Sequence, residues 1–123
     1  MFDLSDRSGV QLPYLCFGES APISRHVEPL LAARGLHARL GIVYENSMAG
    51  ALRVRARDGA GVAWLPRRLV QPDMEAGQLT IAGESKWSVK LEIRLHRLSA
   101  NTNPLTRKIW TFLAVREGVP LVP

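Results

Sequence analysis

The sequence predicts an α/β fold in which parallel strands alternate with helices, and three observations lead to this class. Between Pro13 and Pro66, stretches with apolar residues three or four apart alternate with short apolar runs. Short turns that carry glycine or serine separate them. The run Gly61–Leu65 is wholly apolar, as expected of a strand buried on both faces. The resulting β-α-β-α-β order is half of a doubly wound unit, with helices on the sheet faces.

The first strand is expected at Pro13–Phe17, after a polar extension or linker over residues 1–12. Ser20 is expected to cap the helix that follows. The apolar stripe of this helix consists of Ile23, Val27, Leu30 and Leu31. Pro29 lies inside the stripe and is expected to kink the helix or to end its regular part early. Gly35 closes the element.

The second strand is expected at Ala38–Tyr44, and the next helix is expected to be capped by Ser47, or by Asn46 beside it. The sequence Asp58-Gly59-Ala60-Gly61 stops this helix, because glycine adopts the left-handed conformation at little cost. Pro66 then ends the third strand, since it has no N–H to donate.

The pattern changes after Pro66. A helix broken at Pro72 is expected over Arg67–Ala76, and a short strand over Leu79–Ala82. Ser88–Arg97 alternates apolar and polar residues, which predicts a strand with one uncovered side.

The last helix is expected at Leu105–Val115, ended by Gly118 and Pro120. One strand and one helix cannot form an independent sheet layer. We therefore expect Ser88–Val115 to pack on the preceding residues, on another chain, or on a part outside this sequence.

Chain length, net charge and the distribution of basic residues limit the classes of function that the protein can have. The chain has 123 residues, enough for one domain, and a net charge of +5. The basic residues are scattered, and Arg53, Arg55 and Arg57 do not form one helical stripe, so a solvated surface is favoured over a nucleic-acid track. The sequence contains neither an apolar run long enough for a membrane span nor the pattern of a signal peptide, which predicts a cytoplasmic protein.

Reactive chemistry is sparse. Cys16 is the only cysteine and lies in an apolar run, so a buried packing role is favoured over redox sensing; for Cys16 and Met48 the sequence leaves redox activity open. The histidines lack metal-ligand spacing, and no phosphate loop is present. Glu19, Glu45 and His26 could do acid–base work. Helix-end electrostatics and ligand contacts are the preferred roles of the two glutamates, and packing or surface exposure that of His26, so we expect no enzyme, no cofactor and no metal.

The carboxyl ends of parallel strands are where such sheets bind ligands. Here those ends carry turn residues, hydroxyl groups and helix amino termini rather than a catalytic group. This set of groups is suited to binding a small polar or anionic molecule without transforming it.

Several segments in order resemble the carboxyl-terminal part of the effector domain of LysR-type transcriptional regulators. The resemblance begins at Pro13-Tyr14-Leu15-Cys16-Phe17 with its Ser-bearing turn and Arg25, and it is stronger at the Gly-x-Gly-apolar-Ala-x-Leu-Pro segment, residues 59–66. It continues through Leu69, Gly77-Gln78-Leu79, Glu92-Ile93-Arg94-Leu95 and Trp110-Thr111-Phe112-Leu113, and so covers about residues 12–115.

The resemblance implies a type II periplasmic-binding-protein-like effector domain, built of two α/β lobes with a small-molecule inducer between them. Residues 13–86 would form a doubly wound, Rossmann-like second lobe, residues 87–117 a strand and helix returning to the first lobe, and residues 118–123 a tail. Carried onto this sequence, the ligand-facing residues are Gly18, Glu19, Ser20, Ser24, Asn46, Ser47, Met48, Trp64, Leu65 and Pro66.

The family's winged helix-turn-helix and the first half of lobe one have no counterpart in these residues. The resemblance therefore implies an inducer-binding, dimerising portion of a regulator that would reach DNA only through a helix-turn-helix elsewhere. A self-associating interaction fragment without a ligand response is the alternative, and in both readings a homo-oligomer is expected.

Overall fold

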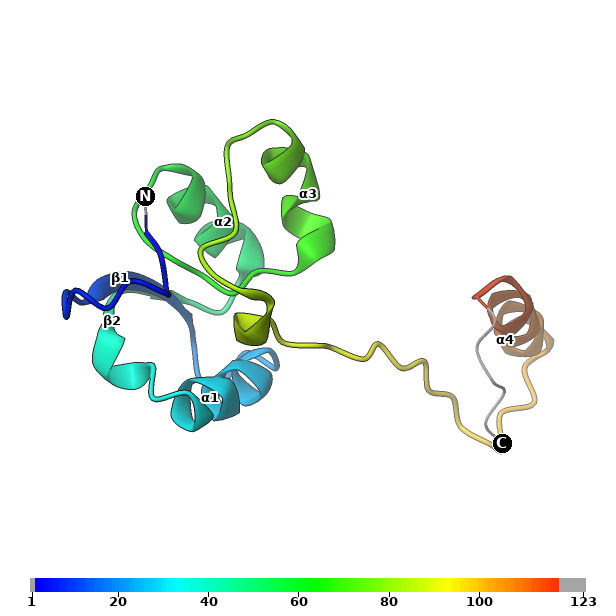
Figure 1. The fold of residues 1–123 in the computed structure, drawn as a ribbon. Coiled ribbons are helices and arrows are strands. Elements are labelled where there is room, and N and C mark those ends of the chain that lie inside the picture. Colours follow the sequence, from blue (N-terminus) through cyan, green and yellow to red (C-terminus); the bar gives the residue numbers. More distant parts are fainter. Residues whose placement is uncertain (1, 118–123) are drawn as a thin grey trace. The chain divides into compact units, whose positions relative to one another are not determined.

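The computed structural model describes residues 2–117 and divides the chain into two compact units. Unit 1 is Met1–Leu91 and unit 2 is Glu92–Pro123. Both strands and most of the buried residues belong to unit 1. The combination of strands and helices confirms the α/β class (Figure 1).

Unit 1 is built on two parallel strands, β1 (Leu12–Phe17) and β2 (Leu40–Asn46). Leu12 pairs with Leu40 at one end and Phe17 with Asn46 at the other. The register shifts between Tyr14 and Leu15, where Val43 of β2 is passed over. The strands thus end side by side, and the turns that follow them share one edge.

The expected third strand, Gly61–Leu65, is reduced to a single parallel bridge between Val62 and Tyr14. The Leu15 amide donates to the Val62 carbonyl at 2.8 Å, and the Val62 amide donates to the Pro13 carbonyl at 2.9 Å. Gly61 makes this approach possible, because a Cβ there would lie 2.5 Å from the Pro13 carbonyl oxygen. Val62 is the only one of the five residues that is buried, so the prediction of a regular, doubly buried strand is wrong. The bridge still places β1 in the middle of the layer.

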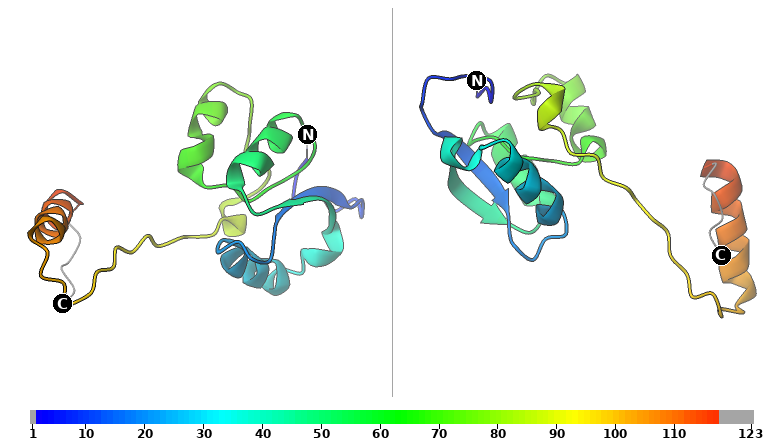
Figure 2. Two further views of the ribbon diagram at one scale, coloured as in Figure 1. Left: turned by 180° about the vertical axis from the view of Figure 1, so that it is seen from behind. Right: turned by 60° about the horizontal axis from the view of Figure 1, so that its bottom comes forward.

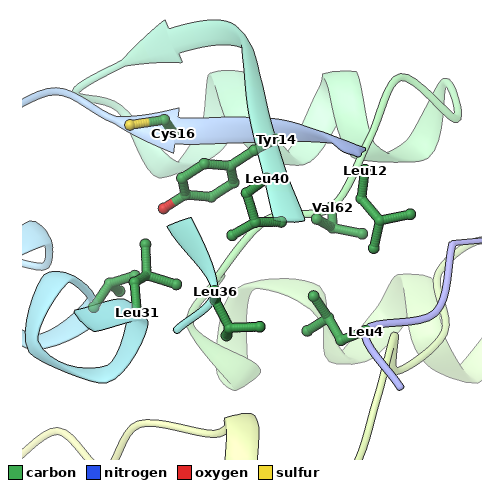
Figure 3. Packing of buried hydrophobic residues seen from close by; sticks show 9 residues of the cluster. Leu4, Leu12, Tyr14, Cys16, Leu31, Leu36, Leu40 and Val62 are labelled. Carbon is green, nitrogen blue, oxygen red and sulfur yellow. The ribbon is translucent and has the colours of Figure 1, made fainter. Parts of the chain in front are cut away.

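Helix α1 (Ser24–Ala33) covers one face of the sheet. Its Val27 and Leu31 belong to a buried cluster that also contains Tyr14 and Cys16 of β1, and Figure 3 shows this packing. Pro29 lies within the helix, which continues to Ala33, so the expected early end is not observed.

Helix α2 (Ala49–Arg57) covers the opposite face, as the views in Figures 1 and 2 show. Its Leu52 is completely buried against Leu15 and Phe17, which point away from the α1 side of β1. The helix ends as expected, with Gly59 at a φ of +75°. Helices on both faces confirm the doubly wound arrangement expected for these residues.

The rest of unit 1 differs from the prediction in three places. Helix α3 (Arg67–Glu75) runs through Pro72 without a break. No strand forms at Leu79–Ala82; instead the Leu4 amide donates to the Ala82 carbonyl at 2.7 Å. Leu4 is buried in the same cluster as Tyr14, Val27 and Leu31, which we call the α1-side cluster. The amino-terminal segment therefore contributes to the core. The remaining short elements are the 3-10 turns η1 (His37–Arg39) and η2 (Ser85–Trp87).

Unit 2 contains helix α4 (Pro104–Glu117), close to the expected bounds. The Asn103 side-chain oxygen accepts the Leu105 amide at 2.9 Å at the start of the helix. The expected strand at Ser88–Arg97 is not formed within the described residues, and Ile93 is 90% exposed. A strand requires a hydrogen-bonding neighbour, and unit 2 supplies none among those residues. Gly118 and Pro120 lie outside them.

Candidate functional site

The turns after β1 and β2 meet at one edge of unit 1, as the parallel register requires. The Gly18 amide donates to the Asn46 carbonyl at 3.3 Å, which continues the pairing one residue beyond β1. Gly18 is buried, and a Cβ there would lie 2.7 Å from the Ser47 hydroxyl oxygen. A glycine at this position therefore lets the two turns approach closely.

The hydroxyl groups of Ser20 and Ser47 meet at this edge. Their oxygens are 3.1 Å apart, and both residues are exposed. Each hydroxyl has one donor and two acceptor positions, so one contact leaves both groups able to bond to a further molecule. This pair is the polar centre of the edge.

Neither serine caps a helix, which corrects both cap predictions. Helix α1 begins after Ile23 and helix α2 after Met48, and neither has a side-chain cap. The Asn46 side-chain oxygen instead accepts the Met48 amide at 2.8 Å in a turn closed by an asparagine side chain. The amide nitrogen of Asn46 donates to the Tyr44 hydroxyl at 3.1 Å, which fixes the side chain. Met48 itself is 70% exposed.

Ser24 lies apart from this polar edge. It is buried, and its hydroxyl donates to the carbonyls of Ala21 at 2.7 Å and Glu19 at 3.3 Å. These bonds hold the turn between β1 and α1. The Glu19 side chain is exposed.

Among the predicted ligand-facing residues, three follow the Val62 bridge and are half-buried: Trp64, Leu65 and Pro66. The Trp64 ring meets the Tyr14 ring edge to face, with centroids 5.6 Å apart, and its N–H donates to the Trp87 carbonyl at 2.7 Å. Leu65 packs against the buried cluster of Leu15, Phe17 and Leu52 on the α2 side of the sheet. Pro66 precedes α3, and its carbonyl accepts the Leu69 amide. The polar group of Trp64 is thus already bonded within the protein.

Sequence reasoning missed a buried ion pair that joins α2 to α3. The Asp73 carboxylate is almost fully buried and accepts two bonds from Arg53, at 2.5 and 3.0 Å. Arg57 lies 3.6 Å from the same carboxylate. The bond from Arg53 holds the pKa of Asp73 below its usual range. The spacing of Arg53 and Arg57 on one helical face was the available signal, but nothing in the sequence identified the acidic partner.

Cys16, the residue weighed for redox chemistry, is buried in unit 1. Burial raises the pKa of the Cys16 thiol, which donates to the Phe17 carbonyl at 3.1 Å. A raised pKa disfavours the reactive thiolate. Within residues 2–117, no group of three or more histidine, cysteine or acidic residues could hold a metal ion. No helix in that range is long and apolar enough to cross a membrane.

Comparison with known proteins places these observations in a family. The family model described as the LysR substrate binding domain matches residues 6–116. The HTH domain-truncated transcriptional regulator QseD of Escherichia coli O157:H7 is 25% identical over 107 residues, which are 87% of this chain and 44% of QseD. The chain thus spans less than half the length of this relative.

Two solved structures show the same fold. The LysR family transcriptional regulator VV2_1132 is 33% identical, with a TM-score of 0.59 over 64% of this chain and 27% of that one. Full-length HypT of Salmonella typhimurium, described as a hypochlorite-specific LysR-type regulator, has a TM-score of 0.70 at 18% identity, over 97% of this chain and 39% of HypT.

Proposed function

This chain belongs to the LysR substrate-binding domain family, and on that premise we propose that it senses a small molecule at the edge formed by the turns after β1 and β2. Its fold is that of LysR regulatory domains, which are periplasmic-binding-protein-like. The relatives are transcriptional regulators, so we propose a role in transcription regulation rather than catalysis.

The observation that carries the proposal is the exposed pair of hydroxyls on Ser20 and Ser47, 3.1 Å apart. They come from different turns, so a bound molecule that bonds to both would hold the two turns together. Directly beside them, helix α2 begins, and the N–H groups of Ala49 and Gly50 have no intrahelical acceptor because they open the helix. Hydroxyl and amide donors together favour a polar or anionic ligand.

Among the ten residues implied by the family resemblance, those around this pair are the core of the proposal. They are Gly18, Ser20, Asn46, Ser47 and Met48. We place Glu19 at the rim, where its exposed carboxylate can meet a cationic group of the ligand. Ser24, Trp64, Leu65 and Pro66 are assigned to shaping the edge, since their polar groups bond within the protein or their side chains pack in it.

Signal transfer requires two arrangements of the complete regulator with different affinities for the ligand. We propose that residues 13–86 act as one lobe, that residues 87–117 complete the other, and that ligand favours one lobe arrangement. DNA contact is assigned to a helix-turn-helix domain outside these residues; a second relative, YjiE of Escherichia coli, is named an HTH-type transcriptional regulator, whereas QseD is named as truncated of that domain. The site of action is proposed to be the cytoplasm.

Thermal denaturation across small carboxylates, amino acids, aromatic acids and oxidants tests the proposal. A ligand that binds only the folded state raises the midpoint with concentration. Oxidants belong in the panel because HypT is described as hypochlorite-specific. We expect a shift that Ser20→Ala and Ser47→Ala each reduce and that Ser99→Ala, an exposed serine of unit 2, leaves intact. A shift unaffected by either edge variant would refute the assignment of the site.

Self-association is a second candidate function, favoured by the exposed apolar residues of unit 2. Ile93 is 90% exposed, and α4 exposes Leu105, Ile109 and Val115. Exposed apolar side chains of this kind favour contact with another copy of the chain. Sedimentation of the chain tests this candidate: we expect an oligomer that Ile93→Glu dissociates and Thr102→Glu does not. A monomer at high concentration would argue against it.

A further inference from the structure

Two tryptophans join the sheet of unit 1 to the segment 82–87. The Trp64 ring N–H donates to the Trp87 main-chain carbonyl at 2.7 Å. Trp64 also packs edge to face on Tyr14, at an interplanar angle of 89°. Because Tyr14 lies on β1, Trp64 links segment 82–87 to the strand that pairs with both β2 and Val62.

A second anchor holds the same segment from its start. The Leu4 amide donates to the Ala82 carbonyl at 2.7 Å. The Trp87 ring lies against Gly83 so closely that a Cβ there would be 2.6 Å from ring atom Cδ1. Leu4, Ala82 and Trp87 all pack on the α1-side cluster. Segment 82–87 is therefore seated on the core, whereas the residues that follow it up to Leu91 have little burial.

The ring nitrogen of Trp87 disfavours this packed position of segment 82–87. The Trp87 ring nitrogen is buried, and no group among the described residues accepts its hydrogen. A buried donor without an acceptor is unfavourable, and exposure to water would satisfy it. One tryptophan N–H thus favours the seated position, while the other favours release.

We propose that segment 82–87 is a releasable latch, closed by the Trp64 N–H and biased toward opening by the unpaired Trp87 N–H. In the open state the Trp87 ring leaves the core and its N–H meets water, while β1, α1 and α2 keep their packing. This local opening changes the course of the chain just before unit 1 ends at Leu91. The latch is a conformational device of the fold and does not depend on the ligand proposed above.

Hydrogen exchange of a full-length chain carrying one altered tryptophan tests the latch. Replacement by 3-benzothienylalanine keeps the shape of the ring and exchanges the N–H for sulfur. The reporters are the amides of Trp87 and Ser88, which donate within η2 at 3.0 Å each. The Leu15 amide, bonded to Val62, reports on the core.

At position 64 the replacement should speed exchange of the reporters about three- to tenfold, the effect of losing one typical hydrogen bond. At position 87 it should slow their exchange, and at position 110, in unit 2, it should leave them unchanged. Trp64→Phe should act in the same direction as the analogue at position 64. Exchange at Leu15 should stay constant throughout. Unchanged reporters at position 64, faster exchange at position 87, or an equal acceleration at Leu15 would each overturn the proposal.

Discussion

Replacing Leu52 by alanine tests whether α2 packs on the sheet as described. Leu52 has no exposed surface and fills the space between α2 and the face of β1 that carries Leu15 and Phe17. Replacing a leucine buried in this way by alanine lowers the free energy of unfolding by about 2–5 kcal/mol, and the upper half of this range is expected where the surrounding side chains cannot fill the cavity. Strand β1 is held by β2 on one side and by the Val62 bridge on the other, so we expect about 3–5 kcal/mol.

The assay is urea unfolding followed by far-UV circular dichroism. A unit the size of Met1–Leu91 has a total stability of about 5–14 kcal/mol, so the loss would be a large share of it. The midpoint should fall at an unchanged slope. Val54→Ala on the same helix, 55% exposed, is the control and should change stability by no more than about 0.5 kcal/mol. A loss below about 1 kcal/mol for Leu52→Ala would refute the described packing of α2.

Three further predictions follow from particular residues. Because Arg53 lowers the folded-state pKa of Asp73, the ionised carboxylate stabilises the fold at neutral pH, and this contribution disappears as the pH falls through that lowered pKa. Asp73→Asn should therefore reduce the stability at pH 7 and should make the decrease in stability between pH 5 and about pH 2 less steep, measured as urea midpoints. An unchanged dependence of the midpoint on pH would contradict the ion pair. Gly61→Ala should destabilise unit 1 strongly, because the added Cβ would meet the Pro13 carbonyl. Gly50→Ala, which adds a Cβ to open space on α2, should stabilise unit 1 by about 0.5–1 kcal/mol. Equal effects of the two substitutions in thermal melts would count against the Val62 bridge. Cys16 should react with a thiol reagent only under unfolding conditions, and rapid labelling of the native protein would disprove its burial.

The sequence was sufficient for elements whose signals are local. The apolar pattern and the turn glycines located β1, α1, β2 and α2 to within a few residues, because periodicity and left-handed glycines are properties of short stretches.

Elements that depend on a neighbour were not predictable in this way. Ser88–Arg97 has a clear alternation, but a strand forms only beside another strand, and unit 2 provides none among the described residues. The Gly61–Leu65 run is apolar throughout, yet it pairs with β1 only at Val62. Pro72 was expected to break α3, but the helix continues through it to Glu75.

The candidate site was predictable in its location and not in its contacts. Parallel strands bring their carboxyl ends together, so the convergence of Ser20 and Ser47 followed from topology. Their contact with each other, rather than with helix amides, required the positions of both turns. The Asn46 side chain closes the turn at Met48 and does not cap α2, which has no side-chain cap.

The most direct test of the ligand-sensing proposal is an amide chemical-shift map of the ¹⁵N-labelled chain, recorded with and without a compound that raises its thermal midpoint. We expect the largest changes at Gly18, Ser20, Ser47 and the first amides of α2, and we expect them to disappear together in Ser47→Ala. Changes concentrated in α4, or spread over the α1 face while the Ser20 and Ser47 amides stay unmoved, would contradict it.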